Sequence, residues 1–369
     1  MKYYLIAGEA SGDLHASNLM QGILLHDPQA QFRFFGGDLM AAKGGELVKH
    51  YREMSFMGFW EVLVNLRQIS RNLNYCKKDI AQYKPDAVIL VDYPGFNMRI
   101  ARFAKQAGYK VFYYIAPKVW AWKESRVKAL RKYVDRLLII FPFEVDYFKK
   151  HGIDAVYCGN PLVDTLVEAG KDEAFIARNK LDGKPIIALL AGSRMQEIKY
   201  NLPVMVGLAE KLSAYQLVIA GAPSLDYSVY EPHIKGTGVK IVFNQTQELL
   251  KHSVAAVVTS GTATLEAALL NVPEVVCYRG SLVSMLIAGM FIKVKYISLV
   301  NLIMNAEVVR ELVQFNLNSE TLFDELSSLL PGQPGREKML NNFAQLREIL
   351  GAKGASNRFA QVVVASATN

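Results

Sequence analysis

A turn of small and hydroxylated residues joins an apolar run at 255–259 to a helical pattern at 263–270; it consists of Ser260, Gly261 and Thr262. Free backbone N–H groups and the helix dipole bind anions at the start of a helix, and glycine lets a phosphate approach the backbone closely. Glu266 lies about one helical turn further on, within reach of the ribose hydroxyls of a nucleotide bound at this turn. An ordinary crossover with a capping hydroxyl and a solvated glutamate explains the same pattern, so both interpretations stand at this point.

A second candidate phosphate contact follows the apolar run at 186–190. Ser193 and Arg194 stand at the end of this run, and an arginine there can bind phosphate oxygens through two hydrogen bonds. Glu197 is placed to orient Arg194 or to cap the next helix, and the alternative for Arg194 is a surface position at a helix start. The chain has no Asp-x-Asp motif to hold a divalent ion on a diphosphate. We therefore expect a metal-independent reaction.

Candidate acid–base and sugar-binding residues follow two predicted strands of the first half. Asp92 comes after the apolar run at 87–91 and is placed to accept a proton from an attacking hydroxyl, although an aspartate before Pro-Gly also forms turns. Glu9 and Ser11 lie in the hexapeptide GEASGD after the run at 2–7, and we expect Glu9 to contact sugar hydroxyls. Because GEASGD is not the GxGxxG fingerprint, no nicotinamide or flavin cofactor is expected.

The elements that must position these residues alternate between strands and helices. Apolar runs predict strands in the first half at 2–7, 31–35, 87–91, 111–115 and 136–141, and the alternation resumes at residue 186. This pattern predicts an α/β fold of two doubly wound parallel sheets, in which ligands bind beyond the carboxyl ends of the strands. We expect a first domain at 1–164, a polar linker at 165–184 and a second domain at 185–345, with a crevice between the domains.

The composition limits the class of protein and its partners. A chain of 369 residues, about half of them apolar, is long enough for two domains. Its formal net charge of +8 favours anionic partners, and without a basic low-complexity tail nucleic acid is not the expected one. Cys76, Cys158 and Cys277 have neither metal-site nor disulfide spacing, and the first residues show no signal-peptide pattern. We expect a cytoplasmic protein without a resident metal.

The segment 55–73 carries an apolar face with aromatic residues and two arginines. The residues expected to contact a membrane are Phe56, Phe59, Trp60, Leu63 and Val64. A face of this kind suits insertion into a bilayer interface. A core helix is the default explanation of the same pattern, so the residues alone leave both open.

Taken together, the motifs resemble the lipid A disaccharide synthases, glycosyltransferases of the two-Rossmann-domain (GT-B) type. GEASGD, MGFWEVL, DYPGFN, PKVWAWK, FPFE, GNPLVD, GSRMQEI, SGTATLEA and SLVNL occur in the family's order and span nearly the whole chain. The resemblance implies transfer of 2,3-diacylglucosamine from its UDP derivative to 2,3-diacylglucosamine 1-phosphate, which yields a β-1,6 disaccharide and UDP. It also implies a peripheral position on the inner membrane, because both substrates carry acyl chains.

The resemblance assigns roles to individual residues. Asp92 matches the base, and Glu9 and Ser11 match the sugar side of an acceptor domain. The UDP side is assigned Ser193, Arg194, Ser260, Gly261, Thr262 and Glu266, with Arg279 and Asn301 added. Tyr93 and Gly95 stand where other members have an alanine and a second carboxylate, so the role of that carboxylate does not transfer. The last helix, at about 350–369, is expected to return to the first domain, and a homodimer is expected from segment exchange in some members.

Two other classes of protein remain consistent with these residues. One is a related UDP-N-acetylglucosamine enzyme of the same fold, either a 2-epimerase or a peptidoglycan N-acetylglucosaminyltransferase. The aromatic segment 55–73 argues against an epimerase of a soluble sugar. The other class is a non-catalytic nucleotide-sugar sensor, which would bind UDP without turnover and would not need Asp92.

Overall fold

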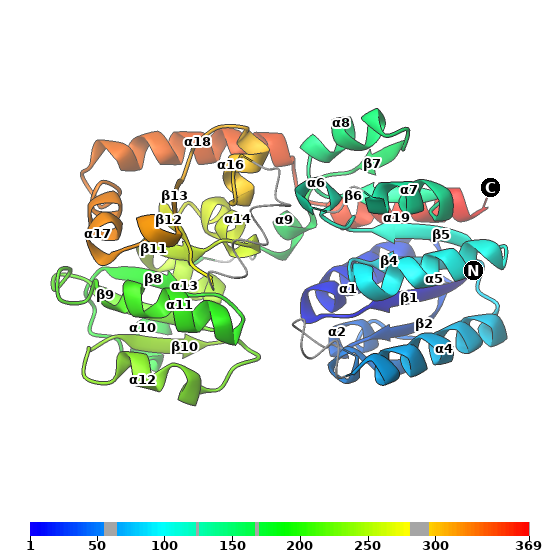
Figure 1. Cartoon of the computed structure of the whole chain (residues 1–369), viewed down its shortest axis with the longest axis horizontal. Coiled ribbons are helices and arrows are strands. Elements are labelled where there is room, and N and C mark those ends of the chain that lie inside the picture. The colour runs from blue at the N-terminus through cyan, green and yellow to red at the C-terminus, as the bar shows by residue number, and fades with distance from the viewer. Residues whose placement is uncertain (55–64, 123–124, 167–169, 281–294, 369) are drawn as a thin grey trace. The chain divides into compact units, whose positions relative to one another are not determined.

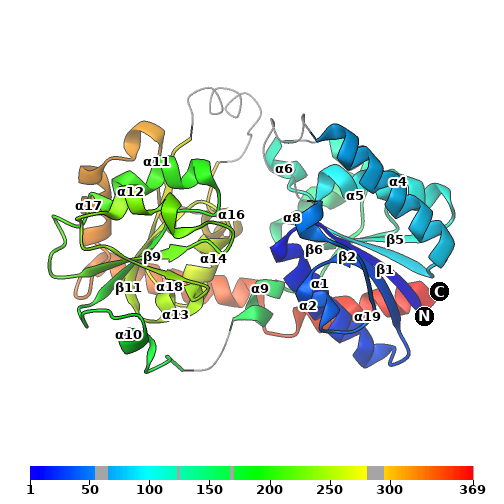
Figure 2. The same cartoon turned by 90° about the horizontal axis from the view of Figure 1, so that it is seen from below.

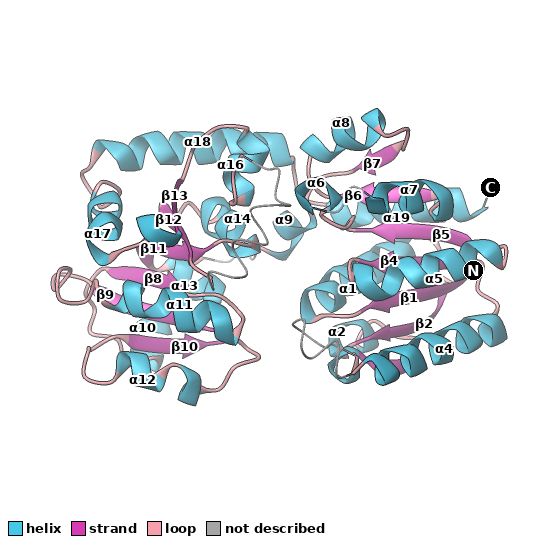
Figure 3. Cartoon of the chain, viewed as in Figure 1, coloured by secondary structure: helices cyan, strands magenta, loops and turns pink. Residues whose placement is uncertain are grey.

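A computed structural model describes residues 1–54, 65–122, 125–166, 170–280 and 295–368. The chain divides into two compact units, each with its own parallel sheet (Figure 1). Unit 1 contains Met1–Asp164 and Leu350–Asn369, and unit 2 contains Thr165–Ile349. Helices cover both faces of each sheet (Figure 3). The α/β fold with two doubly wound sheets is confirmed.

The sheet of unit 1 has the strand order β3-β2-β1-β4-β5-β6-β7, and all neighbouring strands are parallel. Its strands are β1 (Lys2–Ala7), β2 (Gln31–Gly36), β3 (Glu46–His50), β4 (Ala87–Val91), β5 (Lys110–Tyr114), β6 (Arg136–Ile139) and β7 (Ala155–Tyr157). Its principal helices are α1 (Ala10–His26), α2 (Asp38–Ala41), α4 (Leu66–Tyr83), α5 (Pro94–Gln106), α6 (Val119–Trp122), α7 (Ser125–Tyr133), α8 (Phe143–Lys150), α9 (Pro161–Thr165) and α19 (Ala355–Thr368).

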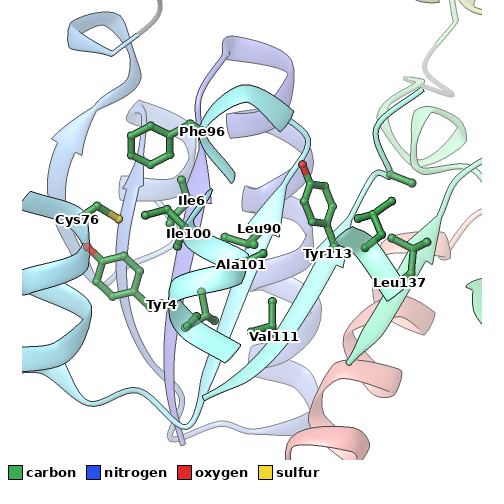
Figure 4. Close-up of a cluster of buried hydrophobic side chains, with 14 of the residues drawn as sticks. Tyr4, Ile6, Cys76, Leu90, Phe96, Ile100, Ala101, Val111, Tyr113 and Leu137 are labelled. Carbon is green, nitrogen blue, oxygen red and sulfur yellow. The ribbon is translucent and has the colours of Figure 1, made fainter. Parts of the chain in front are cut away.

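The central strands of unit 1 are continuous apolar runs because both faces of the sheet are buried. Alternate side chains of a strand point to opposite faces, so Tyr4 and Ile6 join one core while Tyr3 and Leu5 join the other. The first core lies under α4 and α5, and Figure 4 shows its residues from both the strands and these helices. The second core lies under α1 and α19.

The returning helix α19 completes the second core of unit 1. Its fully buried residues are Ala355, Phe359, Ala360 and Val363. The Asp164 carboxylate fixes its start by accepting hydrogen bonds from the N–H groups of Gly354, Ala355 and Ser356 at 2.7, 3.2 and 2.7 Å. Figure 2 shows α19 beside α1, and the contact between these helices confirms the expected return to the first domain.

The sheet of unit 2 has the order β10-β9-β8-β11-β12-β13, again with parallel neighbours. Its strands are β8 (Ile186–Leu190), β9 (Gln216–Gly221), β10 (Lys240–Phe243), β11 (Ser253–Thr259), β12 (Glu274–Tyr278) and β13 (Arg310–Val313). Its helices are α10 (Phe175–Arg178), α11 (Met195–Val206), α12 (Glu231–Ile234), α13 (Thr246–Lys251), α14 (Thr262–Leu269), α16 (Leu299–Met304), α17 (Ser319–Ser327) and α18 (Pro334–Leu350).

The segment predicted as a linker at 165–184 contributes to unit 2. Its short helix α10 places Phe175 at 0% exposure in the core beneath β8 and β11. No helix within the described ranges is both long and apolar enough to cross a bilayer.

Candidate active site

The candidate residues follow the strands at which each sheet reverses its order. In unit 1 the reversal falls between β1 and β4, and in unit 2 between β8 and β11. Ligands of doubly wound sheets bind at this switch point, outside the carboxyl ends of the strands. Glu9 and Asp92 follow β1 and β4, while Arg194 and Ser260 follow β8 and β11. Each unit therefore carries its own group of predicted residues at its switch point.

The backbone at Asp92 is held in a left-handed conformation. Asp92 and Tyr93 have φ values of 45° and 46°, which are uncommon for residues other than glycine. The buried Asn97 amide donates to the carbonyl oxygens of Val91 at 3.1 Å and Asp92 at 2.8 Å. The Tyr113 hydroxyl donates to the same Asp92 oxygen at 2.7 Å. These bonds stabilise a strained turn, and strain of this kind concentrates at functional sites.

The electrostatic environment of the Asp92 carboxyl suits a base at neutral pH. Its pKa is raised to about 6, first by burial and then by the negative charge of Glu9, while Lys118 and a hydrogen bond from the Tyr93 N–H partly offset this rise. A carboxyl with this pKa is ionised at pH 7 and is more basic than an exposed one. The structure thus brings Glu9 close to Asp92 at one switch point.

In the GEASGD turn, Asp13 stabilises the fold, whereas Glu9 and Ser11 are accessible to solvent. Glu9 is partly exposed at the start of α1, and Ser11 is exposed. The Asp13 carboxylate is instead buried, and it accepts N–H bonds from the start of α2, including Gly37 at 2.8 Å. A side chain at Gly8 would collide with the Tyr93 ring at 2.3 Å. Tyr93 therefore packs directly on the turn that carries Glu9.

In unit 2, Glu197 organises the loop after β8. Its carboxylate accepts a hydrogen bond from the Ser193 N–H at 2.8 Å and forms an ion pair with the Arg194 guanidinium at 2.9 Å. Gly192 has φ 109°, and a side chain there would collide with Glu197 at 2.4 Å. Glu197 thus contacts Arg194 and the residue before it, whereas the N-cap residue of α11, Arg194, makes no side-chain capping hydrogen bond. The Arg194 side chain remains 60% exposed and accessible to a ligand.

The turn after β11 presents the start of α14. The Ser260 hydroxyl donates to the Ile297 carbonyl at 2.8 Å, so it fixes the turn, while Thr262 is exposed. No side chain caps the first turn of α14 in the described part of the chain. Glu266 is half-buried one turn further on; burial raises its pKa and a hydrogen bond with Gln247 lowers it. A phosphate beside Gly261 and a hydroxyl beside Glu266 fit this arrangement.

Two residues assigned to the UDP side use their polar groups inside unit 2. The Arg279 guanidinium donates to the carbonyl oxygens of Gln314 and Leu317. The Asn301 amide is fully buried; its nitrogen donates to the Val309 carbonyl at 2.8 Å and to Glu311 at 2.9 Å. Its oxygen accepts the N–H groups of Val308 and Val309, just before β13, at 2.7 and 2.9 Å. In this structure both residues brace the edge of the sheet.

The remaining predicted contacts are placed as follows. Phe56, Phe59, Trp60, Leu63 and Val64 lie outside the described residues. Further along the same predicted segment, Ile69 packs against the first core of unit 1 and Leu73 is buried in it. Among the residues that the structure describes, no group of His, Cys, Asp and Glu is arranged to hold a metal ion.

Sequence reasoning missed a buried carboxylate beside this site. Glu144, at the start of α8, is 1% exposed and accepts the Trp120 indole N–H at 3.0 Å. Burial raises its pKa to about 7. The motifs PKVWAWK and FPFE contain these residues, but nothing in either motif indicates that they pair. Trp120 and Glu144 are 24 residues apart in the sequence, and their hydrogen bond forms only because the folded sheet places the two segments next to each other.

Two doubly wound parallel sheets, one in each unit, define a fold of the GT-B type. The structure is similar to UDP-GlcNAc 2-epimerase from Neisseria meningitidis bound to UDP-GlcNAc, with a TM-score of 0.71, 12% identity and coverage of 99% of this chain and 100% of that one. It is also similar to the calicheamicin glycosyltransferase, with a TM-score of 0.59, 16% identity and coverage of 98% and 97%. At these identities the similarity establishes the fold alone.

The full-length sequence comparisons identify the family. A family model described as lipid-A-disaccharide synthetase matches residues 3–363. The lipid-A-disaccharide synthase of Myxococcus xanthus (strain DK1622) is 40% identical over 368 residues, or 98% of this chain and 96% of that protein. That of Syntrophus aciditrophicus (strain SB) is 38% identical over 365 residues, or 96% and 95%. The chain belongs to the lipid-A-disaccharide synthetase family and is a glycosyltransferase.

Proposed function

We propose that this enzyme transfers 2,3-diacylglucosamine from UDP-2,3-diacylglucosamine to 2,3-diacylglucosamine 1-phosphate. The products are the β-1,6-linked disaccharide 1-phosphate and UDP. The observation that carries this proposal is the similarity to lipid-A-disaccharide synthases over nearly the full length of the chain. Polar residues at both switch points support it, because transfer needs one group for the acceptor and another for the leaving nucleotide.

Asp92 acts as the base on the acceptor in this mechanism. Its carboxylate takes the proton of the attacking 6-hydroxyl as the oxygen bonds to the anomeric carbon, with inversion. A pKa of about 6 keeps Asp92 ionised at neutral pH. Glu9 and Ser11 border the same switch point and bind sugar hydroxyls, and Glu9 also raises the basicity of Asp92.

The leaving UDP is stabilised by residues of unit 2. Arg194 pairs with the diphosphate, and Ser193 and the start of α14 at Gly261 and Thr262 donate hydrogen bonds to it. Glu266 accepts bonds from the ribose hydroxyls. The roles that the structure favours for Ser260, Arg279 and Asn301 are to hold the turn and the sheet edge behind the nucleotide.

Membrane attachment and self-association complete the proposal. Phe56, Phe59, Trp60, Leu63 and Val64 enter the interface of the inner membrane, where the acylated substrates reside, and the enzyme is peripheral. We also propose a homodimer and domains at 1–164 with 350–369 and at 185–345, joined by 165–184. The compact units at Met1–Asp164 with Leu350–Asn369 and at Thr165–Ile349 support the boundary after residue 164 and the return of 350–369, although they count residues 165–184 with the second unit.

One reconstitution tests the reaction. Purified enzyme is incubated with both proposed substrates in neutral detergent micelles, with and without EDTA, and products are separated by mass. We expect a disaccharide 1-phosphate under both conditions. Conversion of UDP-N-acetylglucosamine to its epimer, or UDP binding without turnover, contradicts the proposed activity. A loss of product in EDTA that magnesium restores contradicts the metal-independent mechanism.

A further inference from the structure

The Tyr93 ring joins the two turns that carry the carboxylates of the acceptor side. A Cβ atom at Gly8 would lie 2.3 Å from two atoms of this ring and 2.7 Å from a third. Non-bonded carbon atoms need about 3.5 Å, so the ring fills the space that a side chain at Gly8 would take. Because Gly8 precedes Glu9 and Tyr93 follows Asp92, a single ring belongs to one turn and contacts the other.

Two further contacts fix the orientation of this ring. The Tyr93 hydroxyl donates to the Met54 carbonyl at 2.9 Å, and the ring stacks on Phe96 with centroids 5.6 Å apart and 26° between the planes. Met54 and Phe96 are both buried in the first core of unit 1, where Figure 4 shows Phe96. The ring therefore cannot turn away from Gly8 without losing contacts to this core.

The backbone at Tyr93 is strained. Its φ of 46° lies in the left-handed region, where a bulky residue is an outlier. The Tyr93 carbonyl accepts the N–H groups of Phe96 at 3.2 Å and Asn97 at 3.0 Å, and the Tyr93 N–H donates to the Asp92 carboxylate. Strain of this kind persists only where the surrounding structure fixes it. The fixed residue is thus in direct contact with the carboxylate proposed as the base.

We propose that Tyr93 is a positioning residue for sugar transfer, whose ring fixes the turn of Glu9 against the turn of Asp92. This inference rests on the proposed function, in which Asp92 takes the proton of the attacking hydroxyl and Glu9 binds the same sugar. A base must lie within hydrogen-bond reach of the proton that it takes. Without the ring, the turn at Gly8 can move into the vacated space, and the two carboxylates no longer meet one sugar in the reactive arrangement.

Two substitutions at Tyr93 test this role in steady-state kinetics with both substrates in neutral micelles. Tyr93→Ala should lower kcat by about 10- to 10²-fold, the scale for a displaced catalytic group, and should leave the KM of the UDP-sugar unchanged because unit 2 binds the nucleotide. Tyr93→Phe keeps the ring over Gly8 and should stay within a few-fold of the parent.

The pH profile distinguishes positioning from a general loss of structure. Burial and the charge of Glu9 raise the pKa of Asp92, and Lys118 lowers it. Removal of the ring exposes the carboxyl and loosens the turn of Glu9, so both raising effects weaken while Lys118 is unchanged. The fall of kcat/KM at low pH should therefore shift to lower pH in Tyr93→Ala and stay in place in Tyr93→Phe. An unshifted profile in Tyr93→Ala overturns the proposal.

A double-mutant cycle tests the contact with Gly8 directly. The φ of Gly8 is not positive, and the three atoms nearest to an added Cβ all belong to the Tyr93 ring. Gly8→Ala alone should therefore displace the ring and lower kcat. In the Tyr93→Ala background the same methyl group enters vacated space and should cause no further loss. Independent, multiplicative losses in the double variant overturn the proposal.

Tyr83 is a matched control in the same unit. It is also half-buried, packs on the same core, and donates its hydroxyl to a backbone carbonyl, that of Gln31 at 3.2 Å. Gln31 begins β2, so Tyr83 lies at the amino end of the sheet, opposite to the predicted site. Tyr83→Ala should lower the melting temperature but leave kcat and the pH profile unchanged at a temperature where it is folded. An equal loss of kcat in Tyr83→Ala overturns positioning by Tyr93.

The proposal can also be judged without turnover. If the parent forms no disaccharide, the proposed reaction is contradicted, and titration of the Asp92 carboxyl by ¹³C NMR in the parent and in Tyr93→Ala replaces the kinetic pH profile. Asp92→Asn assigns the signal. A lower pKa of Asp92 in Tyr93→Ala supports the positioning role, and an unchanged pKa overturns it.

Discussion

Replacing Asp92 with asparagine removes a base while it preserves the surrounding turn. Asn97 and Tyr113 hold the turn through the Asp92 carbonyl oxygen, which the substitution keeps. The amide oxygen of asparagine can still accept the hydrogen bond from the Tyr93 N–H that the carboxylate accepts in the parent. We therefore expect a folded variant that binds UDP like the parent, with kcat lowered by about 10²- to 10⁴-fold, the range for loss of general-base catalysis.

The pH dependence of kcat/KM is a second, independent test of Asp92 as the base. With a pKa of about 6, Asp92 is ionised in roughly 97% of parent molecules at pH 7.5 and in about a tenth at pH 5. The parent kcat/KM should therefore fall about tenfold between these pH values as the base is protonated. The residual kcat/KM of Asp92→Asn should not show this fall at low pH, which is called the acidic limb of the pH profile. Stopped-time assays of disaccharide formation across pH 5 to 8.5 measure both quantities.

Two neighbouring charges provide controls with opposite signs. Glu9 raises the pKa of Asp92 and Lys118 lowers it, so Glu9→Gln should move the acidic limb to lower pH and Lys118→Met should move it to higher pH. Activity of Asp92→Asn within a few-fold of the parent refutes the assignment of Asp92 as base, and Glu9 becomes the next candidate. Limbs that do not move in these two variants refute the electrostatic account.

Three further predictions concern other parts of the chain. Arg194→Ala should lower kcat/KM by about 10²- to 10³-fold, the scale of an electrostatic contact to a leaving group, and unchanged kinetics would assign it a structural role. Trp60→Ser with Leu63→Ser should weaken sedimentation with vesicles at an unchanged melting temperature; a sharp fall in that temperature would indicate core residues. Glu274 is fully buried, its carboxyl has no hydrogen-bond partner among the described residues, and burial raises its pKa well above the usual value. Since the unfolded carboxyl ionises first as pH rises, the parent loses stability above the ordinary glutamate pKa. Glu274→Met should therefore raise the free energy of unfolding by about 1–3 kcal/mol, more at pH 8 than at pH 5, and an equal gain at both pH values would contradict this reasoning.

The sequence predicts the central strands of both units because these strands are buried on both faces. Residues 3–7 and 87–91 are continuous apolar runs, and they lie in β1 and β4 as the structure has them. The edge strands cannot be predicted from apolar runs in this way. β3 (Glu46–His50) and β13 (Arg310–Val313) carry charged residues, and the apolar run of β7 has only three residues, which is too short to predict a strand. Their pairing depends on neighbouring strands that lie distant in the sequence.

The candidate site is predictable where a residue directly follows a central strand. Asp92 and Arg194 stand in this position, and the switch-point rule then places them at the ligand-binding edge. Partnerships across the sheet are not predictable in this way. The pairing of Glu144 with Trp120, and the internal hydrogen bonds of Asn301, depend on side-chain geometry that neither spacing nor residue type reveals.

The return of α19 to unit 1 has a consequence for synthesis on the ribosome. The face of the β1 sheet under α1 lacks Phe359 and Val363 until those residues have been translated. All of residues 165–349 are made first, which at typical elongation rates takes about ten to forty seconds. During this interval the first unit has an uncovered apolar strip, and the second unit is complete before α19 has been translated. Unit 1 is therefore the last unit to be completed, and its nascent form exposes apolar surface until α19 has been made.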